Sequence, residues 1–262
     1  MLRGLLSTLG VYKLYERWLR MQIKGGRMPA HIGVILDGNR RWARSHNLIA
    51  VQGHWEGADR VKKLLEWCFN FNIKAVTLYA FSTENFSRST EEVGELMKIY
   101  ETYLDELLKS KVVHENHVRI RVLGRTTMLP EKLQELIAKT EKATENYDRF
   151  FLNVALAYGG RAEIIDATRA IAEEIKAGSL EPAEINEQVM EKHLYTSYMP
   201  NPEPDLIIRT SGEFRLSNFL LWQAAYSEIF IVDVYWPEFR EIDLERAIRS
   251  YQQRGRRFGK LA

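Results

Sequence analysis

HIGVILDGNRRWAR, residues 31–44, begins with a β-rich run that ends at Asp37 and continues into a polar, basic segment. After the Gly25-Gly26 break, the chain alternates such β-rich runs with segments whose apolar residues recur at helical spacing. This alternation is typical of parallel strands joined by crossover helices. The predicted strands are His31–Asp37, Lys74–Phe81, Val118–Leu123, Phe150–Ala157, Asp205–Arg209 and Ile229–Val234.

The segments between these runs predict amphipathic helices with one long apolar face each. We expect helices around Ala58–Phe69 and Val93–Leu108, one opened by Pro130, one near Glu163–Ala177, and a last one capped by Asp243 and ending near Arg254. The sequence shows no internal repeat and no long linker. It therefore predicts an α/β fold with a six-stranded, mostly parallel sheet, in which residues 29–262 form a single domain.

Composition limits the partners of the chain. Lysine and arginine number 37 against 35 for aspartate and glutamate, so nucleic-acid binding has no general support and any anion site must be local. The single cysteine, Cys68, excludes an intrachain disulfide, and its place on an apolar helix face indicates buried packing. No run of about 18 apolar residues predicts a membrane-spanning helix. We expect a cytoplasmic protein.

Residues 1–28 predict a basic amphipathic helix, because leucines alternate with arginines and lysines and only Glu16 is acidic. A secretory signal is not indicated, since the apolar core Leu5–Tyr12 is short and interrupted by polar residues. Two interpretations of this extension remain open. It could dock on its own domain or on a partner protein, or it could lie on a membrane surface.

Polar residues gather where the first predicted strand ends. Asp37-Gly38-Asn39 is followed by three arginines within five residues, Arg40, Arg41 and Arg44. Arginine forks bind phosphate oxygens two at a time, a glycine lets backbone N–H groups approach an anion, and a carboxylate can hold the Mg²⁺ that bridges diphosphate oxygens. A solvated turn would explain Asp-Gly and Asn equally well if this segment stood alone.

Two further strand ends carry similar residues. The second strand runs into Ser82-Thr83-Glu84-Asn85, followed by Phe86 and Arg88, and the fifth runs into Arg209–Asn218. Because the carboxyl ends of parallel strands meet at one edge of a sheet, the three segments predict a single anion pocket. Within this pocket, we expect one diphosphate to be bound by Arg209, Arg215 and Ser217. A second diphosphate would be bound by Arg40 and Arg41.

Motifs of several other enzyme classes are absent. The chain has no G-x-x-x-x-G-K-[ST], G-x-G-x-x-G, G-x-S-x-G or H-E-x-x-H, and no D-D-x-x-D of the trans-prenyltransferase kind. His54 could be a phosphate ligand or an acid at the site, or a structural hydrogen-bonding group ahead of a helix.

From about Pro29 to Gly259 the chain resembles cis-prenyltransferases of the undecaprenyl diphosphate synthase type. The segments that carry the resemblance are His31–Arg44, Thr77–Arg88, Asn153–Arg161, Leu206–Trp222 and Ser227–Pro237. The resemblance implies a six-stranded sheet, a hydrophobic cleft for a growing prenyl chain, and a homodimer whose active sites borrow residues across the interface. It also implies Mg²⁺-dependent condensation of isopentenyl diphosphate with an allylic primer, giving a polyprenyl diphosphate of about undecaprenyl length that serves glycosyl carrier lipids.

The resemblance also implies roles for individual residues. Asp37 matches the essential aspartate and Mg²⁺ ligand, Glu228 a metal-associated glutamate, and Asn85 the asparagine of the proton-removal step. An amide is a very weak base, so we expect Asn85 to position isopentenyl diphosphate or a relay water. Arg257-Phe258-Gly259 resembles an element that reaches the neighbouring active site. The matching substrate-binding residues are Gly38, Asn39, Arg40, Arg41, Trp42, His54, Ser82, Thr83, Glu84, Phe86, Arg88, Arg209, Arg215, Leu216 and Ser217.

Two residues differ from the pattern common in bacterial members. Ala50 stands where they carry an arginine, and Arg40 where they often carry glycine. With the basic extension, these differences resemble archaeal and eukaryotic members, and the archaeal branch above all. We expect geranylgeranyl diphosphate as the primer, with farnesyl diphosphate as the alternative. Two rival functions remain: a noncatalytic subunit of a heteromeric cis-prenyltransferase, and a polyprenyl-phosphate carrier. Both predict that the chain alone makes no product.

Overall fold

The structure, a computed structural model, describes residues 11–254. Six strands form one sheet in the order β3-β4-β2-β1-β5-β6, and all neighbouring strands are parallel. The predicted fold class is therefore confirmed. The strands are β1 (His31–Ile35), β2 (Ala75–Ser82), β3 (Val118–Leu123), β4 (Phe150–Tyr158), β5 (Leu206–Arg209) and β6 (Glu228–Ile231).

Helices connect the strands in the order expected for crossover connections. The α-helices are α2 (Val11–Ile23), α3 (Asn39–Ser45), α4 (Ala50–Asn70), α5 (Thr90–Lys109), α6 (Lys111–Glu115), α7 (Glu131–Thr144), α8 (Gly160–Lys176), α9 (Glu187–His193) and α10 (Glu241–Gln253). Short 3₁₀ turns lie between them: η1 (Thr83–Ser87), η2 (Thr126–Met128), η3 (Pro182–Glu184) and η4 (Trp236–Glu238).

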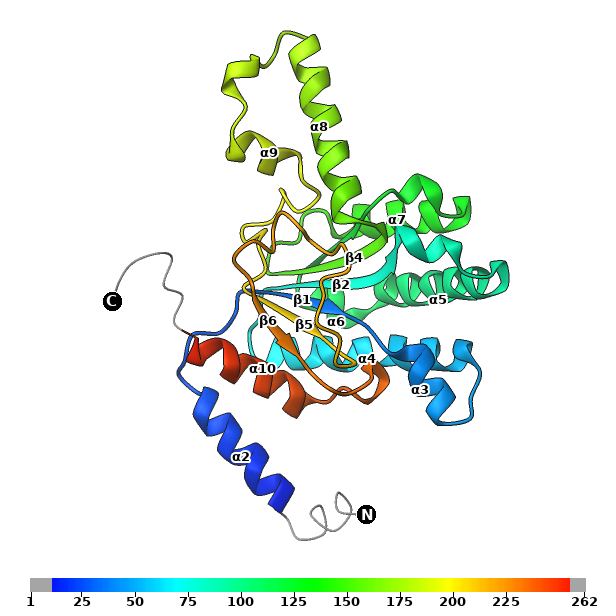
Figure 1. Cartoon of the computed structure of the whole chain (residues 1–262), viewed down its shortest axis with the longest axis vertical. Helices are drawn as coiled ribbons and strands as arrows, with labels where there is room; N and C mark the ends of the chain where they lie inside the picture. The colour runs from blue at the N-terminus through cyan, green and yellow to red at the C-terminus, as the bar shows by residue number, and fades with distance from the viewer. Residues whose placement is uncertain (1–10, 255–262) are drawn as a thin grey trace.

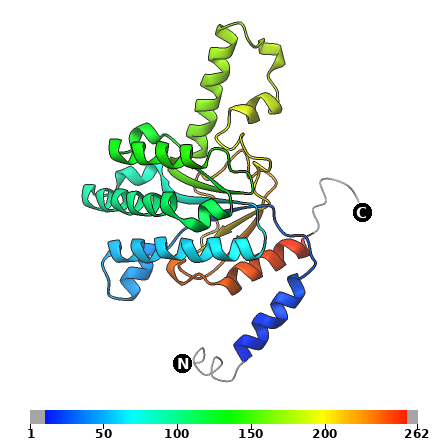
Figure 2. The ribbon, with the colours of Figure 1, turned by 180° about the vertical axis from the view of Figure 1, so that it is seen from behind.

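The helices α4, α5, α7 and α10 form a layer on one face of the sheet (Figures 1 and 2). Their apolar residues pack on alternate strand residues such as Ile32, Val34 and Ile120, which are fully buried. Cys68 belongs to this core and is buried, as predicted. The segments 194–205 and 210–227, on either side of β5, cover the opposite face, while α8 and α9 form an arm that projects beyond the sheet (Figure 1).

Three predicted boundaries need correction. β1 ends at Ile35 rather than Asp37, because the Asp37 N–H donates to the Ile35 carbonyl in a tight turn. β6 ends at Ile231 rather than Val234, because Val232 and Val234 accept hydrogen bonds from Gly212 and Ser211, which form a turn after β5. The last helix begins at Glu241, two residues before Asp243. Asp243 still caps it, because its carboxylate accepts a hydrogen bond from the Arg240 N–H at 3.1 Å.

Helix α2 docks on α10. Leu19 and Ile23 are buried against the body of the protein, and the Arg20 guanidinium donates to Glu245 at 2.7 Å. The open question about the extension is therefore answered in part, since its described portion packs on its own domain. Within residues 11–254, no helix combines the length and the apolar content needed to cross a membrane.

His31 makes stability depend on pH. Its ring is fully buried in the sheet, 2.8 Å from the Thr77 hydroxyl, and burial lowers its pKa to about 4 from 6.5. Between these values the unfolded chain binds a proton that the folded chain excludes, so stability falls as pH falls from 6.5 to 4. The pKa difference corresponds to about 3 kcal/mol.

Urea unfolding at a series of pH values checks this expectation. The His31→Gln variant should lose most of the pH dependence between 6.5 and 4, whereas a His46→Gln control at an exposed site should keep it. Equal pH dependence in wild type and His31→Gln would contradict the assignment.

Candidate active site

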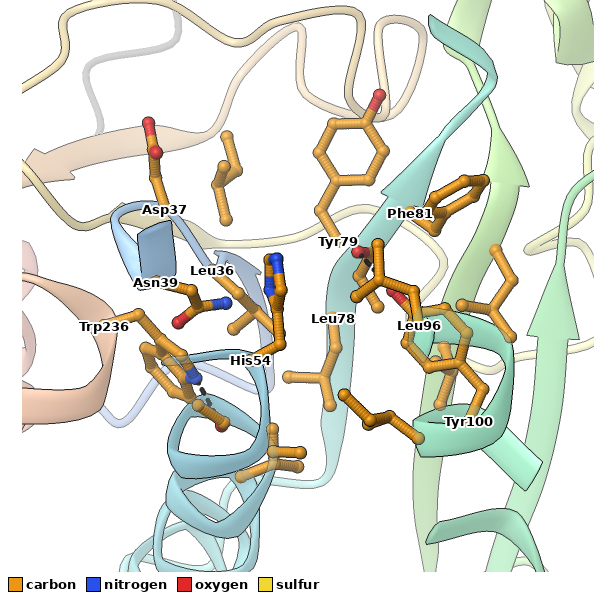
Figure 3. A pocket seen from close by; sticks show the side chains of 18 of the residues that line it. Leu36, Asp37, Asn39, His54, Leu78, Tyr79, Phe81, Leu96, Tyr100 and Trp236 are labelled. Carbon is orange, nitrogen blue, oxygen red and sulfur yellow. Dashed lines mark hydrogen bonds between the residues drawn. The ribbon is translucent and has the colours of Figure 1, made fainter. Parts of the chain in front are cut away.

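A cavity of about 790 Å³ opens at the carboxyl edge of the sheet and runs between β1, β2 and β4 and the helices α4 and α5. Its mouth is polar and its interior apolar (Figure 3). Six arginines line it, against two acidic residues, Asp37 and Glu106. The mouth therefore favours anions, and the walls favour a hydrocarbon chain. The apolar walls include Leu36, Val61, Leu65, Leu78, Leu96, Ile99, Leu104, Leu107, Leu152, Val154 and Leu156.

Asp37 lies in the turn that joins β1 to α3. The next residue, Gly38, has φ 108°, and a side-chain Cβ there would lie 2.2 Å from the Ser211 hydroxyl. Only glycine fits this left-handed turn without a clash. The Asp37 backbone carbonyl accepts hydrogen bonds from Thr210, Ser211 and Trp236. These bonds fix the aspartate at the mouth of the cavity.

Two guanidinium groups bind the Asp37 carboxylate. Arg209 Nη2 donates to Oδ2 at 2.8 Å, and Arg41 Nη2 donates to Oδ1 at 3.1 Å. The Arg209 side chain is only 4% exposed, and it also donates to the Ser217 hydroxyl and to the Arg215 carbonyl. Glu213 in turn accepts from Arg41 and Arg215. Arg41 is thus held between the carboxylates of Asp37 and Glu213, while Arg209 binds Asp37 and Arg215 binds Glu213.

A second carboxylate, Glu92 at the start of α5, organises the other side of the mouth. One of its oxygens lies 3.0 Å from Arg88 Nη1, 3.3 Å from His54 Nε2 and 3.8 Å from Arg40 Nε. Burial lowers the pKa of His54, although its contact with Glu92 opposes the shift and two nearby arginines favour it. The His54 ring thus lies within hydrogen-bonding distance of Glu92 and also lines the cavity.

The turn after β2 carries Asn85 into the cavity wall. Its side-chain oxygen accepts from the Ser82 N–H at 3.1 Å, which caps η1. Glu84 accepts from Asn218 at 3.0 Å and so ties this turn to the segment after β5. Asn218 and Ser217 both have positive φ, a strained backbone conformation that commonly marks functional segments.

Most predicted site residues meet in this cavity. Those that line it are Asp37, Gly38, Asn39, Arg40, Arg41, His54, Ser82, Asn85, Arg88, Arg209, Arg215 and Ser217. Trp42 does not line it and stacks on His46 instead, with ring centroids 4.4 Å apart, while Phe86 packs edge-on against Phe81. Thr83, Glu84 and Leu216 also lie outside the lining, and Arg257, Phe258 and Gly259 lie outside the described residues.

Glu228 does not meet Asp37 within one chain. It is the first residue of β6 and pairs with Leu206, the first residue of β5, whereas Asp37 follows the last residue of β1. The two positions are separated by at least the length of β5, about 10 Å. Glu228 instead binds Arg254 at 2.9 Å. The predicted association of Glu228 with a metal stays a prediction, and the fold of one chain does not bring Glu228 to Asp37.

The described residues contain no group of three or more carboxylate, histidine or cysteine side chains that could hold a metal by themselves. This arrangement still fits Mg²⁺, which proteins commonly bind through one or two carboxylates together with substrate phosphates. Asp37 supplies such a carboxylate beside arginines that suit a diphosphate.

Comparison with known proteins identifies the family. A family model described as "Putative undecaprenyl diphosphate synthase" matches residues 35–259. The chain belongs to the undecaprenyl diphosphate synthase family of cis-prenyltransferases. The resemblance seen in the sequence is therefore confirmed, and the chain is a prenyltransferase.

Archaeal cis-prenyltransferases are similar over almost the whole chain. A protein of Methanopyrus kandleri is 53% identical over 254 residues, which cover 97% of this chain and 93% of the relative. A protein of Methanocaldococcus jannaschii is 49% identical over 255 residues, 97% of this chain and 91% of the relative. Both are named tritrans,polycis-undecaprenyl-diphosphate synthase (geranylgeranyl-diphosphate specific).

Solved cis-prenyltransferase structures share the fold. Lavandulyl diphosphate synthase from Lavandula x intermedia, in complex with dimethylallyl diphosphate, superposes with a TM-score of 0.84 at 38% identity, covering 89% of this chain and 99% of that one. A probable undecaprenyl diphosphate synthase from Campylobacter jejuni gives 0.73 at 33% identity, covering 89% and 100%.

Proposed function

We propose that this cis-prenyltransferase condenses isopentenyl diphosphate repeatedly with geranylgeranyl diphosphate to give a polyprenyl diphosphate of about undecaprenyl length. The observation that carries the proposal is one cavity with an arginine-lined mouth and long apolar walls. A diphosphate fits the mouth and a prenyl chain fits the interior. The names of the archaeal relatives support geranylgeranyl diphosphate over farnesyl diphosphate. The product would serve as a glycosyl carrier lipid precursor.

The two substrates would occupy different parts of the mouth. Arg209, Arg215 and Ser217 would bind the diphosphate of isopentenyl diphosphate, because their donors converge after β5. The turn Gly38–Arg41 and His54 would bind the allylic diphosphate beside the apolar walls. The first cluster then presents the isopentenyl double bond to the allylic carbon of the primer.

The reaction breaks the allylic carbon–oxygen bond and releases diphosphate. The isopentenyl double bond attacks that carbon, and proton loss then forms the new cis double bond. Arg41, with Arg40, would stabilise charge that develops on the departing diphosphate. Asn85 would position isopentenyl diphosphate or a relay water for proton removal, because its amide is too weak a base to accept the proton.

Mg²⁺ would be held by Asp37 together with diphosphate oxygens, and it would supply Lewis-acid stabilisation of the leaving group. Arg41 and Arg209 hold the carboxylate in place at the mouth of the cavity.

Purified chain incubated with labelled isopentenyl diphosphate, Mg²⁺ and either geranylgeranyl or farnesyl diphosphate tests the proposal. We expect Mg²⁺-dependent elongation, faster with geranylgeranyl diphosphate, and lipids near undecaprenyl length on sizing. The chain should do this alone, unlike a noncatalytic subunit or a carrier protein. Absence of elongation with either primer would contradict the enzymatic function proposed here.

We further propose that the chain forms a homodimer through the β6 edge of the sheet. β6 pairs only with β5 in the described sheet, so its other backbone edge is open. Near it Tyr226 is 70% exposed and Ile229 is 43% exposed. Open edges with exposed apolar residues favour pairing with another chain.

Sedimentation velocity checks the dimer. Wild type should sediment as a dimer, and Ile229→Lys should shift it toward the monomer. The control Ile185→Lys changes an equally exposed isoleucine on the projecting arm and should stay dimeric. A monomeric wild type at micromolar concentration would contradict this proposal.

Helix α2 is our proposed contact with a membrane surface. Leu14, Trp18 and Met21, at spacings of four and three residues, are its exposed apolar residues, and Arg17 and Lys24 are basic neighbours. A helix with exposed apolar residues and basic neighbours binds anionic lipid headgroups. We therefore expect anionic lipid to recruit the chain.

Co-sedimentation with lipid vesicles measures this contact. Wild type should bind phosphatidylglycerol vesicles, and Leu14→Ser/Met21→Ser should bind at least about tenfold more weakly, because both side chains are more than 60% exposed and contribute little to folding. The control Ile165→Ser/Ile185→Ser should bind like wild type. Unchanged binding by the α2 variant would remove α2 from the contact.

A further inference from the structure

Two buried glycines lie on one face of α4. Gly53 and Gly57 are one helical turn apart, so both point to the same side of the helix. Glycine is less favourable than alanine inside a helix, so two glycines on one face indicate that another element approaches closely. That element is α3, which packs on α4 and places its first residue, Asn39, against both glycines.

Asn39 fills the space that side chains at the two glycine positions would occupy. A Cβ on Gly53 would lie 2.2 Å from the Asn39 backbone oxygen. A Cβ on Gly57 would lie 2.4 Å from Oδ1, 2.9 Å from Cγ and 3.0 Å from Nδ2 of the Asn39 side chain. Gly53 therefore allows the close approach of the two backbones, and Gly57 makes room for the Asn39 amide.

The oxygen of the Asn39 amide is packed rather than hydrogen-bonded. Oδ1 is buried, and within residues 11–254 no hydrogen-bond donor reaches it. The hydrogen that Gly57 carries in place of a Cβ faces this oxygen, and a C–H···O contact of this kind is weak. The amide nitrogen lies on the side of His54, and both residues line the cavity (Figure 3). A ligand in the cavity would therefore meet the N–H groups of Asn39.

Gly57 also selects the orientation of the amide. With the oxygen against Gly57, both N–H donors of Asn39 remain available to the cavity. The opposite orientation would bury an N–H donor against a C–H group without an acceptor, which is unfavourable. A side chain at position 57 would displace the amide. The contact of Trp236 with α4 would remain, because its indole donates to the Gly57 backbone carbonyl at 2.6 Å.

We infer that Gly57 is a positioning residue for the primer site. It places the Asn39 amide beside His54 with its N–H groups toward the departing diphosphate of the allylic primer, and it acts through Asn39. The inference rests on the proposed elongation reaction, in which the turn Gly38–Arg41 and His54 bind this diphosphate.

Gly57→Ala tests the inference with the addition of one methyl group. The kcat/KM for geranylgeranyl diphosphate should fall by about 10- to 10²-fold, as expected for loss of one hydrogen bond to a charged group, while the KM for isopentenyl diphosphate stays unchanged. Gly94→Ala is the matched control. Gly94 also lies in a helix, α5, but a Cβ there would lie within 4 Å of no atom in residues 11–254. This control should keep the kinetics of wild type.

A double-mutant cycle separates action through Asn39 from distortion of α4 and from a clash with the substrate itself. Asn39→Ala should lower kcat/KM for the primer, and it removes the amide that the new methyl group would meet. Asn39→Ala/Gly57→Ala should therefore match Asn39→Ala in kcat/KM and in melting temperature. If Gly57→Ala alone does not fold, the double variant still should, and it carries the same test.

The inference would be overturned by a Gly57→Ala or Asn39→Ala variant with wild-type kinetics, or by an equal rise of both KM values in Gly57→Ala. A further loss of activity or stability when Gly57→Ala is added to Asn39→Ala would also overturn it. Failure of the proposed function gives a different result, because wild type would then elongate no primer.

Discussion

Asp37→Ala is expected to lower kcat/KM by at least about 10³-fold while leaving the chain folded. The variant loses the carboxylate that would hold Mg²⁺ against the diphosphate, and preorganised electrostatic groups of this kind contribute about 3–4 kcal/mol each. It also releases Arg41 and Arg209 from their shared partner. Both changes reduce stabilisation of the departing diphosphate. Initial-rate kinetics with isopentenyl diphosphate and a saturating primer measure the effect.

Asp37→Asn and Asp105→Ala are the controls for this prediction. Asn keeps the size and one acceptor oxygen of the side chain but removes its charge, so it should be nearly as inactive as Ala. Asp105 lies on α5, where it pairs with Lys109 at the surface, and its replacement should leave kcat/KM unchanged. Near-full activity of either Asp37 variant, with normal thermal unfolding, would show that Asp37 is not the metal ligand.

Arg209→Lys should raise the KM for isopentenyl diphosphate by about 10²-fold and affect the primer much less. The guanidinium of Arg209 joins Asp37 to Ser217 and to the Arg215 carbonyl at the same time. Lysine presents a single ammonium, which cannot reproduce this fork. The variant therefore loses the bidentate contact with isopentenyl diphosphate but keeps the positive charge at position 209. Separate titrations of the two substrates measure the two KM values.

Arg209→Ala has a second consequence. The side chain is 4% exposed and paired, and breaking a buried ion pair from one side costs about 3–5 kcal/mol. The free energy of unfolding should fall by that amount in urea. The exposed ion pair of Arg169 with Asp166 supplies the control, because Arg169→Ala should change neither stability nor KM. For Arg209→Lys, equal increases in the KM values of the two substrates would contradict a clamp that binds only isopentenyl diphosphate.

Local pattern predicted much of the fold. The β-rich run Val118–Leu123 is β3 in full, because it lies between helices that bury its apolar side chains. The polar segments after three strands meet at one edge because all neighbouring strands are parallel. The prediction of a single anion pocket from separate segments therefore follows from sheet geometry.

Other parts of the site depend on contacts between side chains that the spacing of residues in the sequence does not predict. Glu92 and Glu213 hold the arginines of the mouth, yet neither lines the cavity. Glu92 lies outside the polar segments that follow the strands, and Glu213 lies within one of them without a predicted role. Their position in the sequence, close to Arg88 and Arg215, is the signal that could have found them. The separation of Glu228 from Asp37 within one chain could not be foreseen either, because a motif match does not say at which end of a strand a residue lies.

Trp42 and the contact between Asp59 and Tyr103 illustrate the same limit. Trp42 follows Arg41 directly, but a one-residue step on a helix turns the side chain by about 100°, so only Arg41 lines the cavity. Asp59 and Tyr103 are 44 residues apart and join only because α4 and α5 pack side by side. Such pairs become visible only once the helices are placed.

The configuration of the double bonds made by the chain alone tests the central claim most directly. Isopentenyl diphosphate labelled with carbon-13 is incubated with purified protein, geranylgeranyl diphosphate and Mg²⁺, and the product is analysed by NMR. We predict that every added unit carries a cis double bond, and that removal of Mg²⁺ with a chelator abolishes incorporation. Trans double bonds in the added units, or incorporation that persists without Mg²⁺, would contradict the account.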